Sequence, residues 1–400
     1  MTDQTPMMRQ YHSFKERCKD AVLFFRMGDF YEMFYEDAKI ASRVLGIALT
    51  SRAKGEKAVP MAGVPHHSAG PYIQRLIKAG HKVAICEQVQ DPKEAKAIVE
   101  RDITRIITPG TLTDDNLLED KVSNYLAGIL PGKDVVGLSW VELSTGRFEV
   151  EDVTRARVLD ELTRLRPSEC IIPEDVQDIA LMRELGVGLG ITITRRPGWE
   201  FSWDSAHRTL TEHFETSGLE GFGCEGLGPA IGAGGAIIQY LRETQNNSLG
   251  HITKLERFCT QDTLLMDAAT QRGLELLETV RTRQSEGSLV WVLDKTCTPM
   301  GARLLKEWII FPLITAEKIQ LRQEGVSELY GNHTLRGSIR SLLKEISDIE
   351  RISTRVSSGR TNARDLVSLK NSLEVLPRVK EALSEAKSNI LRSLRDGRPP

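Results

Sequence analysis

The feature that most constrains the fold of this chain is a change in hydrophobic periodicity near Leu227, past the middle of its 400 residues. Before it, short apolar runs typical of strands alternate with patterns typical of helices. After it, strand signals nearly vanish and amphipathic helical patterns take over. These helices are expected at residues 230–244, 263–282, 301–310, 316–330, 334–358 and 363–386. The order predicts α/β domains followed by an all-α region that forms a rod or lever rather than a pocket.

Residues 1–110 are predicted to form a small α/β domain with a mixed sheet and helices. Strand patterns occur at residues 21–27, 47–50, 82–88 and 103–108. Helices are expected near residues 8–18, 30–45 and 68–78, with a turn-rich loop at 54–63. Strands that flank each helix in this way are typical of a mixed α/β sheet.

Pro109-Gly110-Thr111 and the acidic stretch at residues 114–120 indicate a domain boundary. Residues 111–245 are predicted to form a second α/β domain. Its strands are expected at residues 125–130, 135–143, 147–150 and 170–172, with a helix at 155–166 and a further helix–strand pair that ends at 193. Residues 246–400 form the helical region. Its last helix has no evident closing partner before Pro400, which we interpret as truncation.

The composition, with 40% hydrophobic and 27% charged residues, is ordinary for a soluble globular protein. No apolar run approaches the length of a membrane span, and the first residues lack the pattern of an export signal. The six cysteines are scattered without close pairs, which favours reduced thiols in the cytoplasm over a zinc ribbon or a disulfide framework. Residues 1–109 hold 17 Lys and Arg against 13 Asp and Glu, a mild basic excess that is compatible with DNA binding but weak on its own.

The sequence predicts no catalytic or cofactor site within the chain. It has no G-x-x-x-x-G-K-[ST] phosphate loop and so no recognisable ATP site. Residues 221–226 match G-x-G-x-x-G, but no strand precedes them, and we interpret them as a flexible lead into the next helix. His66-His67 is the one histidine pair, and adjacent side chains favour a loop or structural role over a metal site. A nuclease needs several convergent carboxylates, whereas the strand at 135–143 offers Glu142 alone, which we interpret as a surface charge.

The most informative segment reads R-M-G-D-F-Y-E-M-F-Y-E-D-A. Its pattern predicts a strand, a Gly-Asp turn and the first turns of a helix. On such a helix Phe30 and Phe34 share one face, and Tyr31 and Tyr35 share another. The aromatic rings would then fill a core, and Glu32 would interact favourably with the helix N-terminus. Taken alone, the segment does not predict a binding site.

Seven segments, in order along the chain, resemble the signatures of the MutS family of mismatch-recognition proteins. They are RMGDFYEMFYEDA at 26–38, VPMAGVPHH at 59–67, AICEQ at 84–88, RIITPGT at 105–111, ELSTGRF at 142–148, MDAAT at 266–270, and TPMG with RLL between 298 and 305. Several independent blocks in one order make coincidence implausible. The resemblance spans nearly the whole chain and is sharpest up to about Thr111.

The resemblance implies a role for the F-x-E motif, which in this family probes DNA from the minor groove. Phe30 would wedge into the base stack and pack on a mispaired base, Glu32 would accept a hydrogen bond from that base, and Tyr31 would face the domain interior. A wedge costs a few kcal/mol of unstacking, and least at a base that is already poorly held. Glu32 is repelled by the phosphates of any duplex, so it would also penalise matched DNA.

Five further residues lie in or near segments that resemble the DNA-facing surface of the family: Met27, Arg52, Met61, Arg101 and Arg105. For each of them, a contact with a phosphate or a groove and a surface or packing role both stay open. Phosphate contacts would make the affinity for DNA fall steeply with salt.

The resemblance also implies the organisation of the protein. The second domain would be a connector similar to an RNase H-like fold, and the helical region would be the first half of a core with lever helices. The clamp and an ATPase domain that binds ATP and Mg²⁺ would lie beyond Pro400. This chain itself would then hold no cofactor and hydrolyse no ATP.

The implied partners are double-stranded DNA with mispairs or small loops, a MutL-type protein that docks on the connector, and a second copy in a homodimer. The implied location is the bacterial cytoplasm, at the nucleoid, without a membrane. Two alternatives stay open: a module that binds only a protein partner through the second domain, and a structure-specific nuclease.

Overall fold

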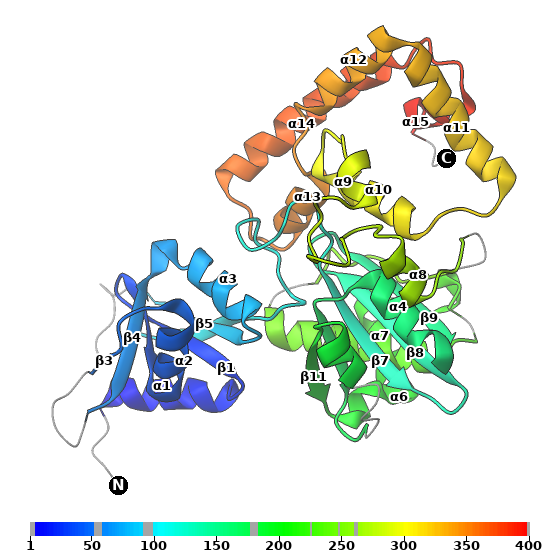
Figure 1. Cartoon of the computed structure of the whole chain (residues 1–400). Coiled ribbons are helices and arrows are strands. Elements are labelled where there is room, and N and C mark those ends of the chain that lie inside the picture. Colours follow the sequence, from blue (N-terminus) through cyan, green and yellow to red (C-terminus); the bar gives the residue numbers. More distant parts are fainter. Residues whose placement is uncertain are drawn as a thin grey trace.

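The computed structural model describes residues 5–51, 58–90, 99–176, 183–224, 226–246, 249–259 and 263–397. Figure 1 shows two sheet-containing parts side by side and an arch of helices that extends from the second part. The expected fold class, mixed α/β sheets with helices followed by a helical region, is therefore confirmed.

The first domain is a mixed sheet of six strands in the order β3-β4-β2-β1-β5-β6. β1 and β5 are parallel, and the other neighbouring strands are antiparallel. The strands are β1 Ala21–Met27, β2 Phe30–Phe34, β3 Thr50–Ser51, β4 Pro60–Pro65, β5 Lys82–Gln88 and β6 Arg101–Ile107. The helices are α1 Pro6–Arg17, α2 Tyr35–Leu45 and α3 Gly70–Lys78.

Helices cover both faces of this sheet, because alternate side chains of each strand point to opposite sides. Leu23 and Phe25 of β1 pack in the core that includes α1. Val22 and Phe24 pack in the core that includes α2 and α3. The helix α1 begins at Pro6, where the Thr5 hydroxyl accepts a hydrogen bond from the N–H of Met8, as expected of an N-cap.

Three predictions for this domain are wrong. The helix expected at 30–45 begins only at Tyr35, because residues 30–34 pair with β1 and β4. The strand expected at 47–50 is reduced to Thr50–Ser51, and the loop expected at 54–63 contains the start of β4. The other expected elements are confirmed to within about two residues, the usual uncertainty of element ends: helices at 8–18 and 68–78, and strands at 21–27, 82–88 and 103–108.

The second domain contains a six-stranded sheet in the order β11-β10-β7-β8-β9-β12. β7, β8 and β9 form an antiparallel meander, and β10 and β11 extend it parallel to β7. This arrangement is that of the RNase H-like fold that the resemblance implied. The strands are β7 Tyr125–Pro131, β8 Val135–Glu142, β9 Arg147–Thr154, β10 Glu169–Pro173, β11 Thr192–Arg196 and β12 Glu256–Arg257, and the helices are α4 Val158–Leu165, α6 Trp203–Phe214 and α7 Pro229–Gln245.

The helix α7 lies directly on this sheet because glycine occupies the points of closest approach. A Cβ at Gly137 would lie 2.0 Å from the carbonyl carbon of Pro229, and a Cβ at Gly128 would lie 2.9 Å from the carbonyl oxygen of Ala233. The glycine-rich segment ahead of α7 forms a short 3-10 turn at Glu220–Phe222, and residues 215–219, directly before it, form no strand. That matches the interpretation of residues 221–226 as a lead into the helix.

A buried carboxylate joins the first domain to the second. Glu169 of β10 is fully buried and accepts hydrogen bonds from the N–H of Gly110 at 3.0 Å and from the hydroxyl of Thr108. The hydroxyls of Thr194 and Tyr240 donate to its other oxygen at 2.6 and 2.7 Å. The R-I-I-T-P-G-T segment is therefore anchored by one acidic side chain.

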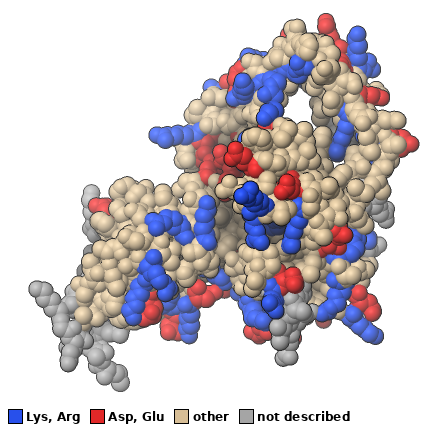
Figure 2. Space-filling view, viewed as in Figure 1, with Lys and Arg blue, Asp and Glu red and all other residues tan. Residues whose placement is uncertain are grey.

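The helical region consists of α8 Ala268–Gly273, α9 Leu289–Leu293, α10 Pro299–Ile310, α11 Ala316–Gly331, α12 His333–Leu343, α13 Ile349–Ser357, α14 Ala363–Ala382 and α15 Asn389–Arg395. α12 packs on α14, and α11 packs on α15. Figure 2 shows an opening that the arch of these helices encloses. Within the described ranges, none of the helices combines the length and the apolar character that a membrane crossing needs.

Three of the long helices expected in this region are wrong in length. The helix expected at 263–282 is limited to α8, and the chain beyond it turns through Glu275, whose φ of 49° is left-handed. The helix expected at 334–358 is divided into α12 and α13, since the Asp348 side chain caps a new helix at the N–H of Arg351. The helix expected at 363–386 ends at Ala382.

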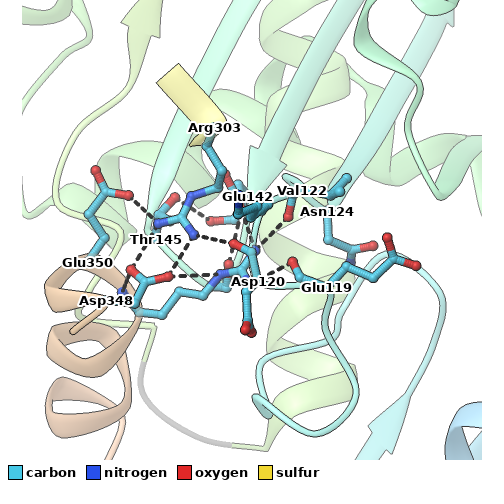
Figure 3. A network of polar contacts seen from close by, with 12 residues as sticks. Glu119, Asp120, Val122, Asn124, Glu142, Thr145, Arg303, Asp348 and Glu350 are labelled. Atoms are coloured by element: carbon cyan, nitrogen blue, oxygen red, sulfur yellow. Dashed lines mark hydrogen bonds and ion pairs between the residues drawn. The ribbon is translucent and has the colours of Figure 1, made fainter. Parts of the chain in front are cut away.

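The segment between the first two domains is held by arginines of the helical region. Figure 3 shows this network around Arg303, with Asp348, Glu350 and Glu142 close by. Arg351, only 2% exposed at its side chain, donates to the carbonyl oxygens of Glu119 and Val122 at 3.1 and 2.7 Å. Its guanidinium also lies 3.4 Å from the carboxylate of Glu142.

Glu142 is therefore not the surface charge that the sequence suggested. The residue is 3% exposed, and its carboxylate accepts a hydrogen bond from Ser144 in addition to the contact with Arg351. Two further arginines bind the same segment: Arg355 pairs with Asp115, and Arg360 donates to the hydroxyl of Thr113 at 3.1 Å. We call Arg303, Arg351, Arg355 and Arg360 the arginine clasp.

Candidate nucleic-acid interface

The F-x-E motif lies at the tip of a tight hairpin. Met27 pairs with Phe30, so Gly28 and Asp29 alone form the turn between β1 and β2. Gly28 has a φ of 56°, a left-handed conformation that glycine adopts without strain. The turn is held from the β4 side, where the N–H of His66 donates to the carbonyl oxygen of Asp29 at 2.9 Å.

The strand conformation places Phe30 and Glu32 on the same face of the sheet, because side chains two residues apart in a strand point the same way. The side chain of Phe30 is exposed at 47%, which is unusual for a phenylalanine in a strand. Glu32 is half-buried beside it. An exposed apolar ring and a half-buried carboxylate thus lie on one face of the same strand.

Across the neighbouring strands, the same face carries two of the residues expected to contact DNA. Met27 pairs with Phe30 in β1, and Met61 pairs with Phe34 in β4. Both methionines are half-buried, at the edge of the core that includes α1. Gly63, which pairs with Glu32, is exposed and adds no side chain.

The remaining arginines differ from one another in position. Arg101 is 9% exposed and donates to the carbonyl oxygen of Arg26 at 2.8 Å and to the side chain of Gln10 at 2.8 Å. Arg105 forms a two-pronged ion pair with Asp114. These contacts favour the packing role for both arginines. Arg52 lies outside the described residues.

The opposite face of β2 anchors the hairpin in the domain. Tyr31 is 6% exposed, in agreement with the expectation that it faces the interior. Its hydroxyl donates to Glu87 of β5, and the guanidinium of Arg26 lies 3.5 Å from the other oxygen of that carboxylate. Burial, followed by the hydrogen bond and the charge of Glu87, raises the pKa of Tyr31 well above its usual value, so the hydroxyl stays protonated as a donor.

The distribution of charge on the surface indicates a binding site less clearly than the hairpin does. On the side of the molecule that Figure 2 presents, Lys and Arg are interspersed with Asp and Glu rather than gathered in one continuous patch. Among the described residues, no group of three or more His, Cys, Asp or Glu is arranged to hold a metal ion. The chemistry that the hairpin offers is insertion of an apolar ring together with acceptance of a hydrogen bond.

Comparison with known proteins gives matches along the chain. Family models match MutS domain I at residues 5–116, MutS domain II at 124–253 and MutS domain III at 269–396. A protein named DNA mismatch repair protein MutS from Halothermothrix orenii is 45% identical over 401 residues, which cover 99% of this chain and 44% of the relative. Proteins of the same name from Symbiobacterium thermophilum and Rhodopirellula baltica are each 44% identical, over 98% of this chain and 46% of each relative.

The chain belongs to the MutS family. It spans somewhat less than half the length of the MutS relatives that it matches. The hairpin with Phe30 and Glu32 lies inside the segment that matches MutS domain I, and the sheet that holds Glu169 lies inside the match to MutS domain II.

Sequence reasoning assigned no site role to three residues of this MutS domain that the structure places around the hairpin. Gly63 borders the exposed face, His66 holds the turn, and Glu87 holds Tyr31. Each lies in a segment that carried the resemblance, V-P-M-A-G-V-P-H-H or A-I-C-E-Q. The position of Gly63 opposite Glu32 depends on the register between β2 and β4, which the helix expected at 30–45 concealed.

Proposed function

We propose that this chain recognises mispaired or unpaired bases in double-stranded DNA through the exposed hairpin of its first domain. Phe30 enters the base stack from the minor groove, and Glu32 accepts a hydrogen bond from the displaced base. The observation that carries the proposal is that a 47% exposed phenylalanine shares one strand face with a carboxylate. If the ring lay in the core, it would be unable to reach a base.

Selectivity in this proposal comes from how easily the duplex deforms. Inserting the ring costs a few kcal/mol of unstacking, and kinking the site adds on the order of 1–6 kcal/mol. A mispaired base has already lost part of its pairing and stacking, so both costs fall there. The carboxylate of Glu32 is repelled by phosphates on every duplex, and only a displaced base with a donor offsets that repulsion.

Fluorescence anisotropy tests this mechanism on a G·T duplex and its matched control at one fixed salt concentration. Phe30→Ala is expected to weaken binding to the G·T duplex and bring the ratio of the two affinities to parity. Glu32→Ala is expected to bind the matched duplex several-fold more tightly, because the repulsion is removed.

Matched controls are available on exposed positions away from the hairpin face. Trp199→Ala removes an aromatic ring that is 61% exposed in the second domain, and Glu36→Ala removes an exposed carboxylate of α2. Both are expected to keep the preference of the wild type. Equal affinity of the wild-type chain for the two duplexes, or an unchanged preference in Phe30→Ala, would contradict the proposal.

For the whole protein we propose an ATP-dependent mismatch sensor that acts as a homodimer at the bacterial nucleoid and recruits a MutL-type protein. The ATP and Mg²⁺ would bind in a part of the protein other than this chain. Support comes from the family and from relatives whose name is DNA mismatch repair protein MutS. A DNA-stimulated ATPase assay on the full-length protein tests the first part of this proposal.

A second candidate is docking of a protein partner on the second domain. Trp199 and Trp203 are 61% and 54% exposed, and Trp203 stacks on His207 with ring centroids 4.7 Å apart. Aromatic side chains such as tryptophan are enriched in protein interfaces. A pull-down with a MutL-type protein tests it, and Trp199→Ala with Trp203→Ala is expected to weaken capture without a change in DNA binding.

A further inference from the structure

The face of β2 opposite to Phe30 and Glu32 carries a chain of contacts that connects three strands. Tyr31 lies between Phe30 and Glu32 and points to the opposite face of β2. Its hydroxyl donates to Glu87, and Arg26 contacts the same carboxylate. We infer that Glu87 is a positioning residue for Phe30 and Glu32, acting through Tyr31 and Arg26. This inference rests on the proposed function of the hairpin.

The geometry joins three adjacent strands through their side chains. Tyr31 of β2 pairs with Arg26 of β1, and Glu87 belongs to β5 on the far side of β1. The carboxylate of Glu87 therefore reaches across the central strand to hold the hydroxyl of β2. The guanidinium of Arg26 also lies 5.8 Å from the centroid of the Tyr31 ring, over its face.

Arg26 extends the connection to the turn itself. Its Nε donates a hydrogen bond to the carbonyl oxygen of Gly28, the first turn residue. His66 holds the second turn residue from the β4 side, through its N–H and the carbonyl oxygen of Asp29 at 2.9 Å. The two-residue turn is thus tied to β5 on one side and to the end of β4 on the other.

A ring that inserts into the base stack needs a firmly held hairpin, because the unstacked DNA exerts a restoring force on it. Unstacking a base step costs a few kcal/mol, and a hairpin that bends at its tip would relieve this cost by moving the ring out of the stack. Binding groups keep their specificity when surrounding contacts hold them to within about 0.5 Å. A buried hydroxyl with a charged acceptor resists displacement, since breaking the bond leaves the Tyr31 hydroxyl without its acceptor.

The position of Tyr31 makes the side chains of Phe30 and Glu32 respond together. A rotation of β2 that freed Tyr31 from Glu87 would move Phe30 and Glu32 in the same sense, because both flank Tyr31 in the strand. Loss of Glu87 is therefore expected to weaken mismatch binding and also to raise the affinity for matched DNA. A role limited to folding would lower stability and leave the ratio of the two affinities unchanged.

The test uses Glu87→Gln, Glu87→Ala, Tyr31→Phe and the double variant Tyr31→Phe with Glu87→Gln. Glu36→Gln serves as the matched control, because Glu36 is an exposed carboxylate whose side chain contacts Lys39 on the surface of α2. The first readout needs no DNA: hydrogen–deuterium exchange of residues 27–32, compared with exchange in β5. The second is the ratio of affinities for G·T and matched duplexes by fluorescence anisotropy.

Glu87→Ala is expected to speed exchange in residues 27–32 and to lower the affinity ratio by about five- to tenfold, the effect of losing the net contribution of one ordinary hydrogen bond. Glu87→Gln and Tyr31→Phe are expected to give smaller falls, and the double variant no more than the larger of the two, since both act through one bond. The control is expected to match the wild type in both readouts.

Two results separate the inference from the proposed function. If the wild type discriminates between the duplexes and Glu87→Ala keeps the same ratio, the inference is overturned and the function stands. If the wild type does not discriminate, the proposed function fails. In that case faster exchange of residues 27–32 in Glu87→Ala would still support the hold of Glu87 on the hairpin, and unchanged exchange would overturn it.

Discussion

Gly63 keeps the exposed face of the hairpin bare between the ring and the carboxylate. A Cβ at this position would lie 3.8 Å from both the Phe30 ring and the side chain of Glu32, and 3.4 Å from the carbonyl oxygen of Tyr31. These are ordinary van der Waals distances, so an alanine fits the backbone. A larger side chain would stand between the two groups that we propose contact the base.

Gly63→Ala and Gly63→Val therefore separate stability from recognition. Gly63→Ala is expected to keep or raise the melting temperature, because replacing a strand glycine stabilises by about 0.4–1 kcal/mol. Gly63→Val is expected to weaken binding to a G·T duplex by about fivefold or more, the effect of about 1 kcal/mol of crowding. Thermal unfolding and anisotropy check both points. Full affinity in Gly63→Val would show that the base does not approach this face.

His251 is a second residue whose environment has a measurable consequence. Burial, together with the nearby charge of Arg360, lowers its pKa to about 4, although its Nε2 lies 3.1 Å from the carbonyl oxygen of Leu143. In the unfolded chain an ordinary histidine takes up its proton near pH 6.5. The unfolded state therefore binds more protons between these values, and the stability of the second domain is lost as the pH falls from about 6.5 toward 4.

At pH 5 this loss is expected to reach about 2 kcal/mol relative to pH 7. Urea unfolding followed by tryptophan fluorescence measures it, since Trp140 is buried in the second domain. His251→Gln is expected to remove most of the pH dependence, whereas His67→Gln, at an exposed position, is expected to keep it. An equal slope in wild type and His251→Gln would contradict the assignment.

At the level of elements, β2 shows why local patterns were insufficient. Aromatic residues at i and i+4 in F-Y-E-M-F-Y-E-D-A share a helix face, and they would share a face in a strand as well, because strand side chains alternate with a period of two. Pairing with β1 and β4 decided between the two, and that pairing depends on contacts that are distant in sequence. The Gly-Asp turn between two apolar runs was the local signal for a hairpin.

Other elements were likewise predicted well where the local pattern decided their structure, and poorly where it did not. β1 and β5 were predicted to the residue because they are short apolar runs bounded by turns. The helix expected at 263–282 was wrong because α8 ends at Gly273 and Glu275 adopts a left-handed conformation, which apolar spacing does not reveal. Phe30, Glu32 and Tyr31 were identified only because the resemblance to a family added to the pattern, and their supports Gly63 and Glu87 required the sheet register.

The start of α2 depends on Asp37, which ties three elements together. Its buried carboxylate accepts hydrogen bonds from Lys15 of α1 at 2.8 Å, from the N–H of Leu23 of β1 at 3.0 Å and from the hydroxyl of Tyr11 at 3.2 Å. Asp37→Ala is expected to destabilise the first domain by about 2–4 kcal/mol, because buried donors lose their acceptor. Hydrogen exchange in β1 and α1 measures the effect. Glu36→Ala, one residue earlier and exposed, is the control, and an equal effect in the two variants would refute the role.

At the scale of the whole molecule, the arginine clasp joins three parts of the chain. Arginines of the helical region bind the segment between the first two domains at Thr113, Asp115, Glu119, Asp120 and Val122. Arg351 also reaches Glu142 of the second sheet. Guanidinium groups of the helical region thus hold the segment through which the first domain is joined to the second.

Arg351→Met is expected to loosen this connection, since it leaves the buried carboxylate of Glu142 without its cation, a loss of about 3–5 kcal/mol. Faster hydrogen exchange in residues 114–122 and a broader distribution of distances between labels on the first domain and on α14 are the expected results. Arg378→Met serves as control, because Arg378 pairs with Glu345 on the surface and such pairs contribute about 0–1 kcal/mol. Unchanged exchange in Arg351→Met would argue against the clasp.

The hydrogen bonds at Glu169 set a condition for chimeras in which domains are exchanged between relatives. One carboxylate receives donors from both sides of the border between the first two domains, Thr108 and Gly110 from one side and Thr194 and Tyr240 from the other. A chimera that exchanges the N-terminal domain between relatives would keep the two domains in the same relative position only if it contains both the donors and the acceptor. If the crossover point lies after Thr111, the incoming domain brings Thr108 and Gly110 as donors. The recipient must then supply the carboxylate of Glu169.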